Sequence, residues 1–125
     1  MPKIENKWDS LYDPGKQTWF TKLEEKAINW YFSRMFGKTI LSASGVKSGK
    51  IFEPGCGSGM TCVQFAQDGF DITLMDLSPN ALKKALTTFE NFGQSCKFTI
   101  GDLFNLPFPD EEFDVVFNQG VMEHF

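Results

Sequence analysis

The chain has 125 residues, of which 42% are hydrophobic and 22% charged, a composition typical of a globular domain and not of a disordered chain. Its formal net charge of −4 argues against a dedicated nucleic-acid-binding protein. No apolar run reaches the roughly 20 residues of a membrane-spanning helix, and residues 1–6 show no apolar signal segment. We therefore expect neither a nucleic-acid partner nor a membrane span.

The cysteines Cys56, Cys62 and Cys96 are odd in number and show no C-x-x-C spacing. The chain has one histidine, so a zinc site is not expected and the predicted metal ligands are none. Reduced thiols are typical of cytoplasmic proteins, and this is the location we predict.

Residues 1–48 are predicted to form a helical extension. A turn at Asp13-Pro14-Gly15 precedes a helical pattern from Thr18 to about Ser42, which Gly37 can split in two. Apolar residues recur there at every fourth position: Trp19, Leu23, Ala27, Tyr31 and Met35. We expect this stripe to pack in the core. The alternative is an aromatic lid of Trp8, Tyr12 and Trp19 that attracts a cation bound beneath it.

From residue 49 to 125 strand-like and helix-like segments alternate. We predict strands over Lys50–Glu53, Phe70–Asp76, Cys96–Ile100 and Phe113–Asn118, and helices over Gly59–Asp68, Pro79–Asn91 and from Val121 onward. Ser78 is a good N-cap for the helix that begins at Pro79. The alternation predicts an α/β fold, a Rossmann-like parallel sheet in the strand order 3-2-1-4 with helices on both faces.

The last predicted strand is followed by only the start of a helix. We therefore expect the chain to be the front part of a longer domain, truncated after the fourth strand; the alternative is a minimal four-strand unit. The fourth strand would then be an open edge with apolar side chains, which predicts self-association.

Three glycines, Gly55, Gly57 and Gly59, lie between the first strand and its helix. Such a turn exposes bare backbone and directs helix N–H groups at a negative ligand group. The spacing is G-x-G-x-G, and Met60 stands where the dinucleotide motif has its last glycine. Glu53 would repel a pyrophosphate but attract a cation. S-adenosylmethionine, which carries an ammonium, a sulfonium and no phosphate, fits these charges.

Two aspartates follow at the ends of the next strands. Asp76 lies 76 − 55 = 21 residues after the first glycine, about the spacing of a ribose-binding acid. Asp102 ends the third strand, where it can accept from the adenine amino group. Leu77 and Leu103 follow these acids and would wall the base.

From about Ile51 to Phe125 the chain resembles the class I S-adenosylmethionine-dependent methyltransferases, in their small-molecule branch. The resemblance rests on five segments in the right order: Glu53–Gly59, Leu74–Pro79, Gly101–Asp110, Phe113–Phe117 and Gly120–Phe125. It implies that Glu53 serves the methionyl end of the cofactor, Asp76 the ribose and Asp102 the adenine. It also implies that Asn118 and Gln119 lie beside the methionyl group. We expect Cys56 and Cys62 to be small packing residues; Cys56 can also contact the cofactor through its backbone. Family members continue through three more strands that build much of the substrate pocket.

The function we predict is methyl transfer to a small-molecule acceptor by in-line displacement. This chemistry needs no general base unless the acceptor must lose a proton early. His124 is a candidate base, and its alternative is a place on a helix face. The acidic run Asp110, Glu111, Glu112 and Asp114 indicates a solvated turn. Two rival functions are a non-catalytic or degenerate cofactor-binding module and a nicotinamide-dependent oxidoreductase.

Overall fold

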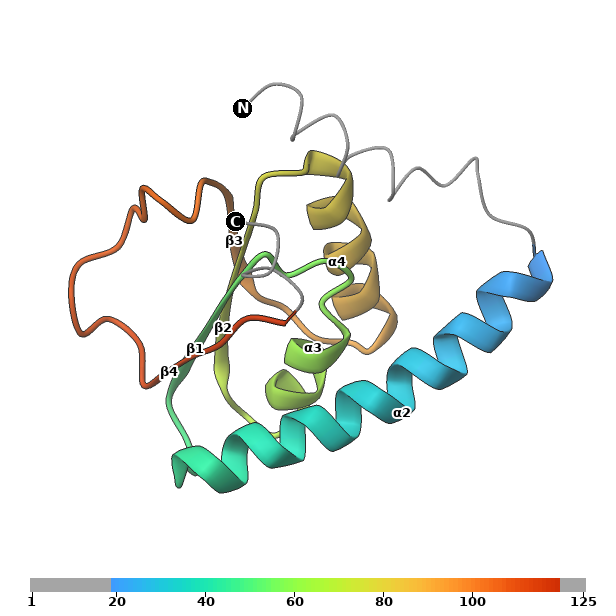
Figure 1. Cartoon of the computed structure of the whole chain (residues 1–125), viewed down its shortest axis with the longest axis horizontal. Coiled ribbons are helices and arrows are strands. Elements are labelled where there is room, and N and C mark those ends of the chain that lie inside the picture. The colour runs from blue at the N-terminus through green and yellow to red at the C-terminus, as the bar shows by residue number, and fades with distance from the viewer. Residues whose placement is uncertain (1–18, 120–125) are drawn as a thin grey trace.

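Four strands and three helices make up residues 19–119, the part of the chain that this computed structural model describes (Figure 1). The side chains of residues 19–26 and of Asn29 are not described. The elements are, in chain order, α2 (Trp19–Ser44), β1 (Lys50–Pro54), α3 (Met60–Gln67), β2 (Asp71–Asp76), α4 (Pro79–Asn91), β3 (Lys97–Ile100) and β4 (Val115–Val116). This is the predicted alternation. The turn at residues 13–15 and the helix expected from Val121 lie outside the described residues.

The four strands form one parallel sheet in the order β3-β2-β1-β4, which confirms the predicted topology. β4 is shorter than the predicted Phe113–Asn118. Asp114 uses its side chain to accept a hydrogen bond from the backbone N–H of Lys50 at 2.7 Å, and the ring of Phe113 stacks on Phe52 with centroids 4.8 Å apart. The backbone N–H groups of Asp114 and Phe117 also donate to the carbonyls of Lys50 and Phe52, at 2.9 and 3.2 Å, so the segment stays beside β1 on both sides of Val115–Val116.

The core lies between the sheet and α3 and α4 (Figure 1). Helices were predicted on both faces, but α3 and α4 lie on the same one, because β1, β2 and β3 follow one another in a single direction across the sheet and both crossovers have the same hand. Strand residues such as Ile51, Ile72 and Leu74 meet helix residues such as Phe65 and Phe89 there, all at most 2% exposed. In the described part of the chain, the connection between β3 and β4 packs against β1 on the other face of the sheet. That connection places the rings of Phe108 and Phe113 on Phe52.

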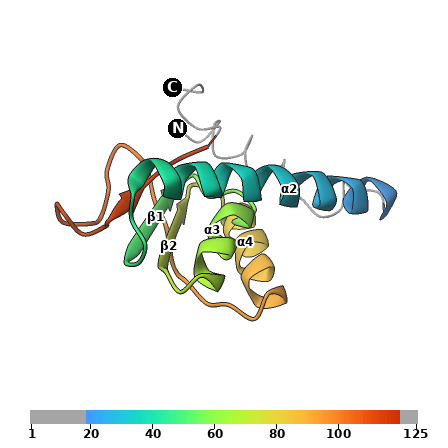
Figure 2. The ribbon, with the colours of Figure 1, turned by 90° about the horizontal axis from the view of Figure 1, so that it is seen from below.

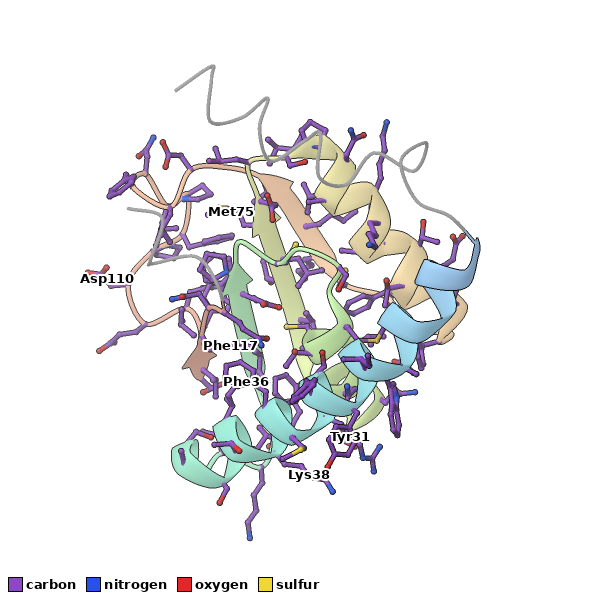
Figure 3. The ribbon with its side chains drawn as sticks, turned by 45° about the vertical axis from the view of Figure 1, so that its right-hand side comes forward. Tyr31, Phe36, Lys38, Met75, Asp110 and Phe117 are labelled. Atoms are coloured by element: carbon purple, nitrogen blue, oxygen red, sulfur yellow. The ribbon has the colours of Figure 1, made fainter. Side chains whose placement is uncertain are left out.

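Helix α2 runs without interruption through Gly37, where a split was possible. A Cβ added at Gly37 would lie 3.2 Å from the ring of Phe65, so the missing side chain allows α2 to approach α3 closely. Phe36 packs edge-on against Phe117 after β4, with ring centroids 6.1 Å apart (Figure 3). Further along α2, Ile40 and Leu41 pack against the core cluster. The packed face of α2 is therefore the one carrying these residues.

We predicted that the apolar stripe of the first helix packs in the core. For Ala27, Tyr31 and Met35, the stripe residues whose side chains are described, this prediction is wrong. Tyr31 and Met35 are 57% and 52% exposed, and Ala27 is exposed as well. The reason is geometric: α2 turns the face with Phe36 and Gly37 toward α3 and β4, and its amino-terminal part extends past α4 (Figure 2). No helix within residues 19–119 is long and apolar enough to cross a membrane.

Candidate functional site

The carboxyl ends of β1, β2 and β3 meet at one edge of the sheet. The register pairs Pro54 with Met75 and Asp76 with Ile100. Beyond the strands, Gly55 N–H donates to the carbonyl of Met75 at 2.7 Å, and Gly101 N–H donates to the carbonyl of Asp76 at 3.1 Å. The end of β2 is therefore bonded to the glycine turn on one side and to the exit from β3 on the other.

Three glycines shape the turn between β1 and α3, and all have positive φ: 68° at Gly55, 53° at Gly57 and 70° at Gly59. Side chains rarely adopt this backbone region. At Gly59 an added Cβ would also lie 3.1 Å from the Cβ of Ala85, because the turn packs directly on α4. Gly59 is the N-cap of α3 and provides no side-chain cap. The first N–H groups of α3 are thus left to other acceptors, as the predicted anion site requires.

Asp76 binds the glycine turn and the start of α4 at the same time. Its Oδ2 accepts from the N–H of Gly57 at 3.1 Å, and its Oδ1 accepts from the N–H of Ser78 at 3.0 Å. Burial raises the pKa of Asp76, while hydrogen bonds from the backbone of Ser78, Gly57 and Leu77 oppose this rise. A carboxylate has about four acceptor sites, so these backbone donors orient the group and leave it able to accept from a ligand.

Glu53 is the buried acid of the site. It is 4% exposed, and its Oε1 has no hydrogen-bond partner among the residues that the structure describes. Desolvation by burial is the main cause that raises the pKa of Glu53 to about 8; the Cys62 thiol lowers it by a hydrogen bond, and the charge of Asp76 raises it. A buried carboxylate oxygen without a partner is costly, so this atom is ready for a donor that the ligand supplies.

Near these acids the cysteines are neutral thiols. All three are free, Cys56 and Cys62 are buried, and Cys96 is half-buried. Burial and the charges of Glu53 and Asp76 raise the pKa of Cys56, burial and Glu53 raise that of Cys62, and burial raises that of Cys96 to about 11. Among the described residues, no group of three or more histidines, cysteines or acids is arranged to hold a metal ion.

The adenine end of the predicted site is more open. Asp102 follows Gly101 and is half-buried, and its Oδ1 accepts from the N–H of Phe104 at 3.0 Å. Leu77 and Leu103 are half-buried at the ends of β2 and β3. Asn118 is half-buried and Gln119 exposed, just beyond β4, which pairs with β1.

Some predicted site residues lie elsewhere or outside the described part. His124, Trp8 and Tyr12 are not among residues 19–119, and the side chain of Trp19 is not described. Asp110 lies on the outside of the connection between β3 and β4, in agreement with a solvated turn (Figure 3).

Sequence reasoning missed the effect of Cys62, whose thiol lowers the pKa of Glu53. Its position near the start of a helix that follows a glycine turn was the available signal, but it was interpreted only as packing. A cavity of about 120 Å³ lies away from the site, near the first residues of three strands, Lys50, Asp71 and Lys97, with Phe108 and Phe113 in its wall. It shares none of the predicted cofactor residues.

Comparison with known protein families gives a match over most of the chain. A family model described as a methyltransferase domain matches residues 52–125. Norajmaline N-methyltransferase from Rauvolfia serpentina is 29% identical over 119 residues, which is 93% of this chain and 41% of that protein. The eEF1A lysine and N-terminal methyltransferase homolog from Drosophila melanogaster is 31% identical over 105 residues, 83% of this chain and 16% of that protein. The chain thus spans less than half the length of these curated relatives.

Solved structures show the same fold. Magnesium protoporphyrin IX methyltransferase from Synechocystis PCC 6803, with bound SAH, superposes with a TM-score of 0.66 at 22% identity. The match covers 96% of this chain and 54% of that one.

Proposed function

The chain belongs to the class I S-adenosylmethionine-dependent methyltransferases, and from this we propose that it binds the cofactor at the carboxyl ends of β1–β3 and methylates a small-molecule acceptor. The observation that carries the proposal is the buried Glu53, whose Oε1 lacks a partner beside a turn of three positive-φ glycines. These groups offer an acid to a cationic group and helix N–H donors to an anionic group.

Each predicted residue has a place in this proposal. Glu53 would accept from the cofactor's ammonium group, and the uncapped start of α3 would receive its carboxylate. Asp76 would accept from the ribose hydroxyls with its remaining lone pairs, and Asp102 from the adenine amino group. The other contacts we propose are from the turn backbone, the apolar walls and the residues after β4: Gly55, Cys56, Gly57, Gly59, Leu77, Leu103, Asn118 and Gln119.

The charges of the site support this cofactor over a nicotinamide dinucleotide. A dinucleotide would bring its pyrophosphate close to the buried carboxyl group of Glu53, which no cation of the described residues neutralises. Met60 is the first residue of α3 and its side chain is half-buried. A dinucleotide-binding motif has glycine at this position. These two features argue against the hypothesis of a nicotinamide-dependent oxidoreductase.

The reaction requires little proton chemistry from the protein. When bound, S-adenosylmethionine supplies a methyl group on a sulfonium, which is already an activated leaving group. The residues of this chain would fix the donor by its two charged ends and its ribose, and the walls of the site would exclude water. We propose that His124 takes up a proton from the methyl acceptor if that acceptor must lose one.

A small-molecule acceptor is supported by two relatives whose names give norajmaline and ajmaline as the acceptors. The name of the Drosophila relative gives a protein acceptor, eEF1A. The competing proposal for the chain itself is a cofactor-binding module without catalysis. We further propose a cytoplasmic location, which the three free thiols support, and self-association through β4, which pairs on one side with β1 and exposes Val116.

Calorimetric titration of the full chain with S-adenosylhomocysteine and with NADH tests the cofactor. We expect micromolar binding of the first and none of the second, and the reverse result would overturn the proposal.

A cell extract separated into small molecules and proteins, incubated with the chain and methyl-labelled S-adenosylmethionine, tests the acceptor. Label in the small-molecule fraction supports the proposal, and label only in protein contradicts it. Binding without label in either fraction identifies a non-catalytic module.

A further inference from the structure

Met75, at the carboxyl end of β2, binds the glycine turn through its main chain (Figure 3). Its carbonyl oxygen accepts from the N–H groups of Gly55 and Cys56, at 2.7 and 3.2 Å. In the sheet it is paired with Pro54 of β1 and with Thr99 of β3. Met75 therefore lies between the turn after β1 and the exit from β3.

The side chain of Met75 reaches the exit from β3. Leu74 belongs to the core cluster under α3 and α4, and because side chains alternate along a strand, Met75 points to the other face of the sheet. It is only 1% exposed there. A Cβ added at Gly101 would lie 2.6 Å from Met75 Sδ and 3.1 Å from its Cγ, so the thioether already fills the space of a side chain at that position.

Gly101 differs in this respect from the glycines of the turn. It does not have their positive φ, so its backbone does not itself demand glycine. The close approach of the Met75 side chain is therefore the physical reason for glycine here.

The backbone at Gly101 in turn places Asp102. The N–H of Gly101 donates to the carbonyl of Asp76 at 3.1 Å, and Asp102 then begins a tight turn. In that turn the Oδ1 of Asp102 accepts from the N–H of Phe104, and its carbonyl accepts from the N–H of Asn105, both at 3.0 Å. A shift of Gly101 would therefore carry the Asp102 carboxylate with it.

We propose that Met75 is a positioning residue for the adenine end of the cofactor, whose thioether packs against Gly101, fixes the turn that carries Asp102 and so sets the selection for the purine amino group. This inference rests on the proposed function, in which Asp102 accepts from the adenine amino group. Met75 acts through Gly101 and Asp102, while its carbonyl fixes the glycine turn at the same time.

A role of Met75 in packing alone makes a different prediction, because a general loss of order weakens every ligand of the site by the same factor. A positioning role predicts a loss of selectivity for the base. S-inosylhomocysteine separates the two, since it carries a carbonyl oxygen where S-adenosylhomocysteine has the adenine amino group. A hydrogen bond to a charged acceptor changes an affinity by about ten-fold or more, so the parent should prefer the adenosyl ligand by at least about ten-fold.

The test measures both affinities by calorimetry in Gly101→Ala, Met75→Ala, the double variant and Met75→Leu. Met35→Ala is the control that removes an exposed methionine from α2. We expect Gly101→Ala and Met75→Ala each to reduce the preference to about three-fold or less, since the first displaces Gly101 and the second removes its support. The double variant should recover most of the preference, because the shortened side chain leaves room for the new Cβ. Met75→Leu, which nearly conserves the volume, and Met35→Ala should keep the parent preference.

An unchanged preference in Gly101→Ala, with both affinities lowered, would overturn the proposal, as would a double variant no better than Gly101→Ala. If Gly101→Ala does not fold, equal preferences in Met75→Ala and Met75→Leu contradict the proposal, and a preference kept only by Met75→Leu supports it. A parent that binds both ligands equally well contradicts it too.

If the parent binds neither ligand, the proposed function fails, and amide exchange in the ligand-free protein still tests the contact. Exchange at the N–H of Gly101 should be faster in Met75→Ala and close to the parent rate in Met75→Leu. The same rate in both variants would show that Met75 does not hold Gly101 in place.

Discussion

Replacing Glu53 by Gln should stabilise the cofactor-free protein in a way that depends on pH. The pKa of Glu53 is raised from its ordinary 4.5 to about 8, mainly because the carboxyl group is desolvated. An acid whose pKa is raised by folding contributes its full stability below the unfolded pKa. That contribution is lost as pH rises from 4.5 through 8, because folding then requires either a bound proton or a buried charge.

The magnitude follows from the width of this window. A difference of 8 − 4.5 = 3.5 pKa units at about 1.4 kcal/mol per unit amounts to about 5 kcal/mol. Glutamine carries no charge, so the free energy of unfolding of the variant should gain about this amount over the parent between pH 4.5 and 8. The net advantage above pH 8 will be smaller, since a buried amide without partners costs about 1–3 kcal/mol.

Urea unfolding followed by circular dichroism, repeated at each pH unit across this window, measures the difference. Glu90→Gln, an exposed site on α4, controls for the loss of one acidic charge. Added S-adenosylhomocysteine should stabilise the parent much more than the Glu53 variant, because the ligand's ammonium would have lost its acceptor. A difference between parent and variant that stays constant with pH would refute the idea that Glu53 is buried without adequate compensation.

Three further predictions concern the turn and its supports. Gly59→Ala should lower the free energy of unfolding by about 2–4 kcal/mol, since it combines a positive φ with a Cβ 3.1 Å from that of Ala85. Gly45 has a similar φ but open space around it, so Gly45→Ala should lower the free energy of unfolding by only about 1 kcal/mol in the same urea experiment. Gly49→Ala should destabilise the chain because its Cβ meets the Asp114 carboxylate, and the same change in an Asp114→Ala background should cost less, which a double-mutant cycle measures. Asp76→Ala should speed amide exchange at its two backbone donors and weaken S-adenosylhomocysteine binding at least ten-fold; unchanged exchange would contradict its role in holding the turn.

Much of the fold could be predicted from local sequence patterns. The bounds of α4, Pro79–Asn91, and its N-cap Ser78, which accepts from Ala81 N–H at 3.1 Å, are as predicted. Strand order and the meeting of three strand ends at one edge were also predicted correctly. These features depend on residues close together in the sequence and on the handedness of crossover connections, which is nearly invariant.

The predictions that failed depend on contacts between distant segments. Tyr31 and Met35 have the periodicity of a core-facing stripe, but α2 turns another face toward α3, and periodicity alone does not say which partner a helix meets. β4 is shorter than predicted, and its neighbours Phe113 and Asp114 contact Phe52 and Lys50, more than 60 positions earlier in the chain. No local pattern contains that information.

The sequence by itself determined the kind of site: glycines where the backbone must turn with positive φ, and acids at the ends of successive strands, whose charges select a cationic cofactor without phosphate. Only the tertiary structure decided the state of those acids. Asp76 is oriented by two backbone donors, whereas Glu53 is enclosed with one oxygen unpaired and a thiol beside it. The physical reason is that charge and chain direction are properties of residues and their neighbours, while desolvation arises from all the atoms that the fold packs around a group.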